Sequence, residues 1–208
     1  NQKSGTIQDK EVDKSPRARG MKKYIYIYNF GDYFARLTGK RIRQAGGSPR
    51  IVSFNTPFHE LKSPAGFILS GSPYGSKRIP VTLLSKEIFA ANYPVMGICL
   101  GAHLINRYFG GRYRGLKRQA ENGIVNLYPV RRTKMLKGLA RQEQVVMMHQ
   151  DSIYSLADGF ETVAKTDKCA VAATAHKKWR WYTFQFHPEL SPCGNKIFAN
   201  FIRLCYKD

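Results

Sequence analysis

The sequence predicts an α/β fold, in which a mostly parallel sheet is flanked by helices and carries a small additional β element. Two observations lead to this prediction: short, fully apolar runs alternate with longer amphipathic runs, and the last third of the chain is richer in β-forming segments. Apolar strands that alternate with helices are typical of parallel sheets, because crossover helices cover both faces. The 208 residues suffice for one sizeable core.

The first half of the chain supplies four predicted strands. The run 23–28 is rich in β-forming residues, and Tyr33, Leu37 and Ile42 then recur at nearly helical spacing until Gly46. This pattern indicates a strand, a turn and a helix. The same reasoning predicts strands over residues 50–54, 66–70 and 94–98, and helices over residues 81–91 and 100–109.

The second half is expected to contribute the additional β element and a terminal helix. Apolar or alternating runs predict strands over residues 123–130, 144–148, 161–164, 170–175 and 181–186, and a helix over residues 195–205. Residues 21–208 are therefore interpreted as one domain. Residues 1–20 are polar and aperiodic, so we expect a flexible extension, which could be a linker from a longer polypeptide, a processed leader or an appended segment.

The chain is strongly basic. It has 34 Lys and Arg against 14 Asp and Glu, a formal charge of +20 that is spread along the whole sequence. Such a surface attracts nucleotides, nucleic acid or an acidic protein, and we favour a protein partner or general surface composition over a nucleic-acid function. The stretch 177–182 could stack on bases but is better explained as a hairpin. The stretch 112–118 could form a basic docking face, although a solvated loop is the simpler interpretation.

Cysteine usage and hydropathy restrict the location of the protein. The chain has four cysteines and no C-x-x-C pair, which suits a reducing compartment; they are Cys99, Cys169, Cys193 and Cys205. No histidine has other ligand residues at the spacing of a metal motif, so no metal site is expected. No apolar run reaches the roughly 18 residues of a membrane span, and the first twenty residues contain no apolar stretch. We therefore expect a cytoplasmic protein with no signal peptide and no membrane association.

The most specific local motif is G-x-C-x-G at residues 97–101, placed where an apolar strand turns into a helix. This is the nucleophile-elbow arrangement with Cys99 as the nucleophile, and its glycines allow the close backbone approaches that expose the side chain. The N-terminus of the following helix favours a thiolate and can hold an oxyanion. A buried structural cysteine between two glycines is the alternative interpretation.

A second motif, Q-F-H-P-E at residues 185–189, follows the last predicted strand. His187 could act as a base, and Glu189 could bond to its imidazole and set the tautomer. A lone histidine after a strand is more often structural. The presence of both motifs in one chain is what favours a nucleophile, a base and an orienting carboxylate.

Together these motifs resemble those of the class I, or triad, glutamine amidotransferases, in which G-x-C-x-G and H-P-E occur in this order and at this separation. The resemblance extends over nearly everything after Met21 and is greatest to the amidotransferase subunits of GMP synthases, particularly the separate subunits of archaea. Further segments that are similar to that branch are 28–31, 68–71, 109–111, 120–121, 147–151, 166–169 and 200–202.

The resemblance implies a flavodoxin-like sheet and a Cys99–His187–Glu189 triad that hydrolyses glutamine. Backbone N–H groups of Leu100 and Ser72, beside Gly71, would hold the oxyanion.

Glutamine itself would be bound by the Met148–Gln150 segment, which includes His149, while Glu121 and Asp151 match positions near the partner-facing side. Ammonia would pass to an ATP-pyrophosphatase subunit or domain for amination of XMP to GMP. This chain would need no cofactor, because ATP and Mg would belong to the partner.

Three positions depart from the family pattern. His103 stands where the family usually has a glutamine that contacts the substrate, Ser72 replaces a glycine, and residues 190–193 replace a His-Thr pair. We expect His103 to take over the substrate contact. The departures leave two alternatives open: a catalytically weakened homologue that acts as a regulatory or binding subunit through its basic surface, or an amide hydrolase that needs no partner.

Overall fold

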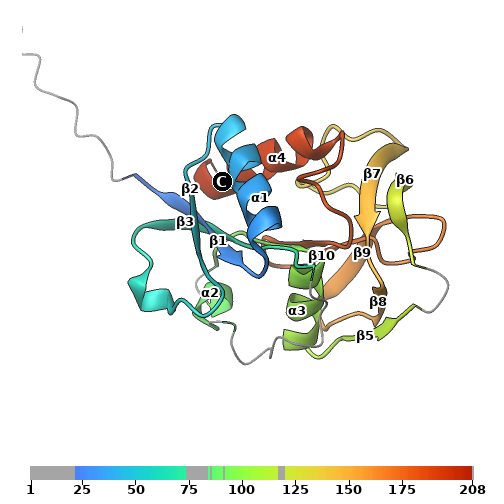
Figure 1. Ribbon diagram of the computed structural model, residues 1–208, viewed down its shortest axis with the longest axis horizontal. Helices are drawn as coiled ribbons and strands as arrows, with labels where there is room; N and C mark the ends of the chain where they lie inside the picture. Colours follow the sequence, from blue (N-terminus) through green and yellow to red (C-terminus); the bar gives the residue numbers. More distant parts are fainter. Residues whose placement is uncertain (1–21, 74–83, 85, 91, 117–119, 208) are drawn as a thin grey trace, which may run out of the picture.

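The computed structural model describes residues 22–73, 84, 86–90, 92–116 and 120–207, and the predicted extension 1–20 lies outside them. In this part of the chain, a nine-stranded mixed sheet has the order β2-β1-β3-β4-β11-β10-β9-β6-β7 (Figure 1). Its parallel half consists of β2 (Pro49–Ser53), β1 (Tyr24–Asn29), β3 (Pro64–Leu69), β4 (Val95–Ile98) and β11 (Trp181–Phe184).

The other half of the sheet is antiparallel and extends it beyond β11. It contains β10 (Ala173–His176), β9 (Phe160–Lys165), β6 (Asn122–Pro129) and β7 (Glu143–Met148). A separate two-stranded sheet pairs β5 (Arg112–Gly115) with β8 (Asp151–Ser155). The predicted combination of a parallel sheet and a smaller β addition is therefore confirmed.

Helices cover both faces of the parallel half. On one side α1 (Asp32–Gln44) packs against α4 (Gly194–Tyr206), and on the other lie α2 (Glu87–Ala90) and α3 (Leu100–Tyr108); a short 3-10 helix, η1, spans Phe58–Glu60 (Figure 1). Successive side chains of β1 point to opposite faces of the sheet. Ile25 and Ile27 belong to the hydrophobic cluster beneath α1 and α4, whereas Tyr26 and Tyr28 belong to the cluster on the other face.

The structure differs from the sequence predictions in several places, including a strand, β8, that was not predicted. Residues 112–115 form β5 rather than a solvated loop, because β8 provides a partner strand that is distant in sequence; residues 117–118 of the same basic stretch lie outside the described residues. Within the helix predicted over 81–91, the described helix covers 87–90, Leu84 lies in a bend, and residues 81–83, 85 and 91 are outside the description.

Strand β11 ends at Phe184, two residues earlier than predicted. Phe184 pairs with Ile98, the last residue of β4, so the neighbouring strand ends at the same level. Strand β10 begins at Ala173, because residues 170–172 are in a turn and bend. No helix in the described part of the chain is long and apolar enough to cross a bilayer.

Candidate active site

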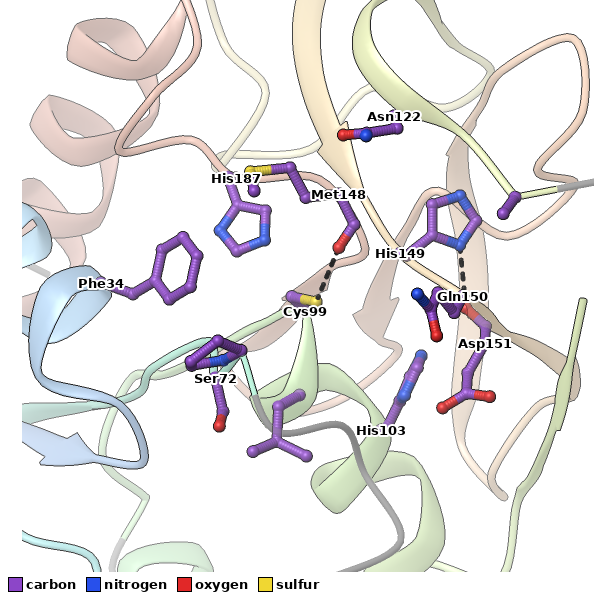
Figure 2. Close-up of a pocket in the computed structure, with 13 residues that line it drawn as sticks. Phe34, Ser72, Cys99, His103, Asn122, Met148, His149, Gln150, Asp151 and His187 are labelled. Atoms are coloured by element: carbon purple, nitrogen blue, oxygen red, sulfur yellow. Dashed lines mark hydrogen bonds between the residues drawn. The ribbon is translucent and has the colours of Figure 1, made fainter.

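The predicted motifs lie beyond the carboxyl ends of three adjacent parallel strands. Gly71 and Ser72 follow β3, Cys99 follows β4, and His187 follows β11. The carboxyl edge of a parallel sheet is where ligands bind in folds of this class. Here it opens into a pocket of about 580 Å³ (Figure 2). The pocket is lined by Phe34, Ser72, Pro73, Cys99, Leu100, His103, Ala120, Asn122, Met148, His149, Gln150, Asp151 and His187.

Cys99 has the strained backbone of a nucleophile elbow. Its φ of 48° and ψ of −101° are uncommon for a residue with a side chain. The strain is maintained by tight packing: a Cβ on Gly97 would lie 2.8 Å from the backbone of Gly101, and a Cβ on Gly101 would overlap the carbonyl oxygen of Leu69. A bond from the Cys99 N–H to the Phe184 carbonyl, at 2.7 Å, ties the elbow to β11. The geometry therefore agrees with the elbow interpretation.

His187 and Glu189 form a buried pair beside this cysteine. The Nδ1 atom of His187 lies 2.7 Å from Oε1 of Glu189, and both side chains are almost fully buried. The Phe34 ring stacks on the imidazole with a centroid separation of 4.5 Å. Gly71 leaves room for the imidazole, because a side chain at residue 71 would place its Cβ 2.8 Å from Cε1 of His187. Sequence, packing and hydrogen bonding thus place an oriented imidazole beside Cys99.

The pKa of His187 is raised by its surroundings. Burial by itself would lower the pKa of His187, but its hydrogen bond with Cys99 and the contact with the Glu189 carboxylate outweigh burial and raise that pKa to about 10. His187 is therefore an imidazolium at neutral pH.

This shift predicts a pH dependence of stability. A histidine whose pKa is near 6.5 when unfolded and about 10 when folded stabilises the folded state fully below pH 6.5, and this contribution is lost as the pH rises toward 10. The free energy of unfolding should therefore fall over that interval, by at most about 1.4 kcal/mol per pH unit from this group. Urea titrations of Cys99→Ala and of Cys99→Ala/His187→Gln at several pH values would measure it, because without the thiol no second group of the pair exchanges protons over that interval; equal slopes in the two proteins would contradict the assignment.

The loop that carries the pair is anchored by Ser191. Its Oγ donates to the carbonyl of His187 at 2.6 Å and accepts the N–H of Val146 at 3.0 Å. The guanidinium of Arg41 donates to the carbonyl of Glu189 at 3.1 Å. Residues 190–193, which depart from the family pattern, thus contain an anchor of their own. Sequence alone could not have revealed this anchor, because one of its partners, Val146, is 45 residues away.

The predicted oxyanion-hole positions lie together at the pocket. Leu100 is the first residue of α3, where N–H groups have no acceptor within the helix, and Ser72 lies across the pocket after β3. Among the described non-glycine residues only Ser63, Asn92 and Cys99 have a positive φ, so serine at position 72 adds no backbone strain. Replacement of the usual glycine is therefore compatible with the geometry.

The predicted substrate-binding residues all line the pocket, but they have different environments. The carbonyl of Met148 lies 3.9 Å from the Cys99 sulfur (Figure 2). Gln150 is exposed, whereas His149 and His103 are buried. The Nε2 atom of His103 lies 2.7 Å from Oε1 of Gln185, so this ring already has a protein partner.

Glu121, which was expected near the partner-facing side, has a buried side chain. It is buried with His149: Nε2 of His149 lies 3.3 Å from Oε2 of Glu121, and Nδ1 lies 2.8 Å from the carbonyl of Asp151. Thr166 donates to the same carboxylate at 2.8 Å. These contacts span 28 and 45 residues of sequence, so no local pattern could have predicted them.

One group of described residues could approach the geometry of a metal site. Ligand atoms of Glu121, His149 and Cys169 lie within 4.8 Å of one another. Since the carboxylate already has the Thr166 hydroxyl and the His149 ring as partners, the arrangement is satisfied without an ion. Burial raises the pKa of the Cys169 thiol, which keeps it neutral.

Comparisons with known proteins agree with this geometry. The family model for class I glutamine amidotransferases matches residues 26–204. A glutamine-hydrolysing GMP synthase subunit from Thermococcus kodakarensis is 33% identical over 185 residues, which cover 87% of this chain and 97% of that protein. GMP synthase of Aquifex aeolicus is 32% identical over 182 residues, covering 86% of this chain, and the chain spans 36% of that longer protein.

Solved structures show the same relationship. A candidate GMP synthase subunit from Thermoplasma acidophilum has a TM-score of 0.82 at 30% identity, covering 88% of this chain and 94% of its own. PurLQS from Thermotoga maritima, at 16% identity and a TM-score of 0.73 over 88% of this chain and 99% of that one, shares the fold. The elbow cysteine, the buried histidine–glutamate pair and these matches together show that the chain belongs to the class I glutamine amidotransferase family.

Proposed function

We propose that this chain hydrolyses glutamine to glutamate and ammonia, and that the ammonia is used by a synthase partner to convert XMP to GMP. The observation that carries the proposal is the convergence of Cys99, His187 and Glu189 at one pocket, with the nucleophile on a strained elbow. The names of the relatives from Thermococcus and Aquifex support the GMP branch.

The first half-reaction uses the charged resting pair. The Cys99 thiolate attacks the side-chain amide carbon of glutamine, and a carbon–sulfur bond forms while negative charge moves to the amide oxygen. N–H groups of Leu100 and Ser72 donate to that oxygen. The His187 imidazolium gives its proton to the amide nitrogen, the carbon–nitrogen bond breaks, and ammonia leaves a thioester on Cys99.

The second half-reaction restores the site. Neutral His187 takes a proton from water as the water oxygen adds to the thioester carbon. The carbon–sulfur bond then breaks, glutamate leaves, and Cys99 and His187 return to thiolate and imidazolium. Glu189 keeps the imidazole oriented and compensates its charge throughout.

A docking surface for the synthase adjoins the pocket. Met148 is opposite Asn122 in the β6–β7 ladder, and Ile124 is two residues further along β6, so the two apolar side chains lie on one face of the strands. They are 45% and 64% exposed. Exposed apolar side chains beside a site are typical of interaction surfaces. ATP and Mg would be bound by the partner subunit or domain, and a cytoplasmic location suits the four free cysteines of this chain.

Covalent labelling with a glutamine-analogue electrophile, followed by mass spectrometry, tests the proposal. We expect modification of Cys99 that excess glutamine suppresses and that Cys99→Ala eliminates. Addition of a candidate synthase would increase the labelling rate if the partner completes the pocket. No labelling of the folded chain, alone or with the synthase, would reject glutamine hydrolysis and leave a binding subunit; full turnover without any partner would instead support a simple amide hydrolase.

A further inference from the structure

A second set of polar contacts reaches the Cys99 sulfur, this time from α3 and the end of β11. Nε2 of Gln185 lies 3.9 Å from Sγ of Cys99, and Oε1 of the same amide lies 2.7 Å from Nε2 of His103. All three side chains are less than 9% exposed. In Figure 2, His103 and His187 are seen on opposite sides of Cys99. The sulfur therefore has a side-chain partner besides His187.

The protonation of His103 determines how this amide is oriented. Burial lowers the pKa of His103, so the ring is neutral at neutral pH and carries one N–H. Because an amide oxygen only accepts, the 2.7 Å contact places that proton on Nε2. The oxygen of Gln185 is thereby held toward His103, and its NH₂ group is directed at the sulfur.

Packing keeps His103 in this orientation. The Tyr113 ring stacks on the imidazole, with centroids 4.9 Å apart and planes 8° apart. Tyr113 belongs to β5, and the backbone N–H of Gln185 is tied to the carbonyl of Ala172 at 2.9 Å. Both ends of the His103–Gln185 contact are thus fixed by neighbouring elements.

We infer that His103 is a positioning residue that, through Gln185, holds an amide donor on the Cys99 sulfur and so increases the thiolate fraction of the resting enzyme. The inference rests on the proposed function, because it concerns the nucleophile of that reaction. An N–H bond to a charged acceptor is stronger than one to a neutral acceptor, so the contact stabilises thiolate over thiol. His103 then acts on the nucleophile rather than on bound glutamine, in contrast to the role expected from sequence.

The pH profile of Cys99 alkylation by iodoacetamide tests this inference without substrate. Removing the donor in Gln185→Met, or the imidazole N–H in His103→Phe, should raise the midpoint by about one pH unit, a roughly tenfold loss of thiolate below the midpoint. His103→Gln, whose amide can donate to Gln185, should recover most of the shift. The titratable groups that face the contact are His187 at the sulfur, and Tyr113, Asp151 and His149 at His103. All four are kept unchanged in every variant.

Kinetics of glutamine hydrolysis provide the second readout. At a pH below the alkylation midpoint, loss of thiolate should lower kcat about tenfold in both variants while KM changes less than twofold. The double variant should be no worse than either single one. Alkylation that is lost in Cys99→Ala is the alkylation of Cys99. His59→Phe, at an exposed position, is the control for replacing a histidine by phenylalanine. Circular dichroism checks that each variant is folded.

Two results would overturn the inference: an unchanged alkylation midpoint in folded Gln185→Met, or a raised KM with unchanged kcat in His103→Phe, which would show a direct contact with glutamine. Failure of the proposed function is distinguishable, because a wild type that the glutamine analogue does not label still gives an alkylation profile.

Discussion

Replacement of Cys99 by alanine is expected to abolish glutamine hydrolysis, with kcat falling by roughly 10⁴-fold or more. Alanine removes the sulfur that forms the thioester, and no other cysteine lines the pocket within the described residues. The fold should persist, because alanine is smaller and adds no contact at the elbow. Ammonia release, measured with the synthase partner present, is the assay.

Cys193→Ala is the matched control for that variant. Cys193 is also buried, but it precedes α4 and does not line the pocket, so its loss should change kcat less than threefold if the protein folds. Substantial hydrolysis by Cys99→Ala, with Cys193→Ala fully active, would remove the elbow cysteine from the mechanism.

Replacement of Glu189 by glutamine is expected to lower kcat by roughly 10²- to 10⁴-fold. The amide cannot compensate the imidazolium charge, so the pKa of His187 should fall and the bond that orients the ring should weaken. Stability at neutral pH should also fall, because the lower pKa of His187 removes the stabilisation that the buried imidazolium–carboxylate contact contributes. The pH profile of kcat and a thermal melt measure both effects.

Glu143→Gln is the control for charge removal. Glu143 pairs with Lys196 at 2.9 Å on the surface and does not line the pocket, so this substitution should leave kcat unchanged. If Glu189→Gln retained wild-type kcat with an unaltered pH profile, the carboxylate would have no part in orienting the base.

The fold and the sharp turn at Cys99 were predictable because local patterns encode them. Apolar runs and glycines at 97 and 101 specify the strand, the sharp turn and the helix within a few residues. Strand β5 was not predicted, because its four residues R-Y-R-G show no apolar pattern and pair with a strand that is distant in sequence. The partner strand, rather than the local sequence, determines its conformation.

The candidate site divides in the same way. Cys99, His187 and Glu189 belong to two compact motifs, whereas Gln185 acquires its contacts only when β11 is placed beside β4. His103 was predicted to contact the substrate. Whether its ring can do so depends on the side-chain orientation, which the sequence does not specify. The ring faces Gln185 because Tyr113 and the amide hold it there.

Gly101 lies in close contact with the Leu69 carbonyl, and this contact makes the Cys99 side of the pocket rigid. The elbow is wedged between β3 and β11 and cannot shift without breaking backbone packing. The opposite side of the pocket differs, because Met148, the last residue of β7, and Gln150, which lies between β7 and β8, are exposed. Substitutions are therefore expected to be tolerated there more readily than at residues 97 and 101, where any side chain would collide with neighbouring backbone.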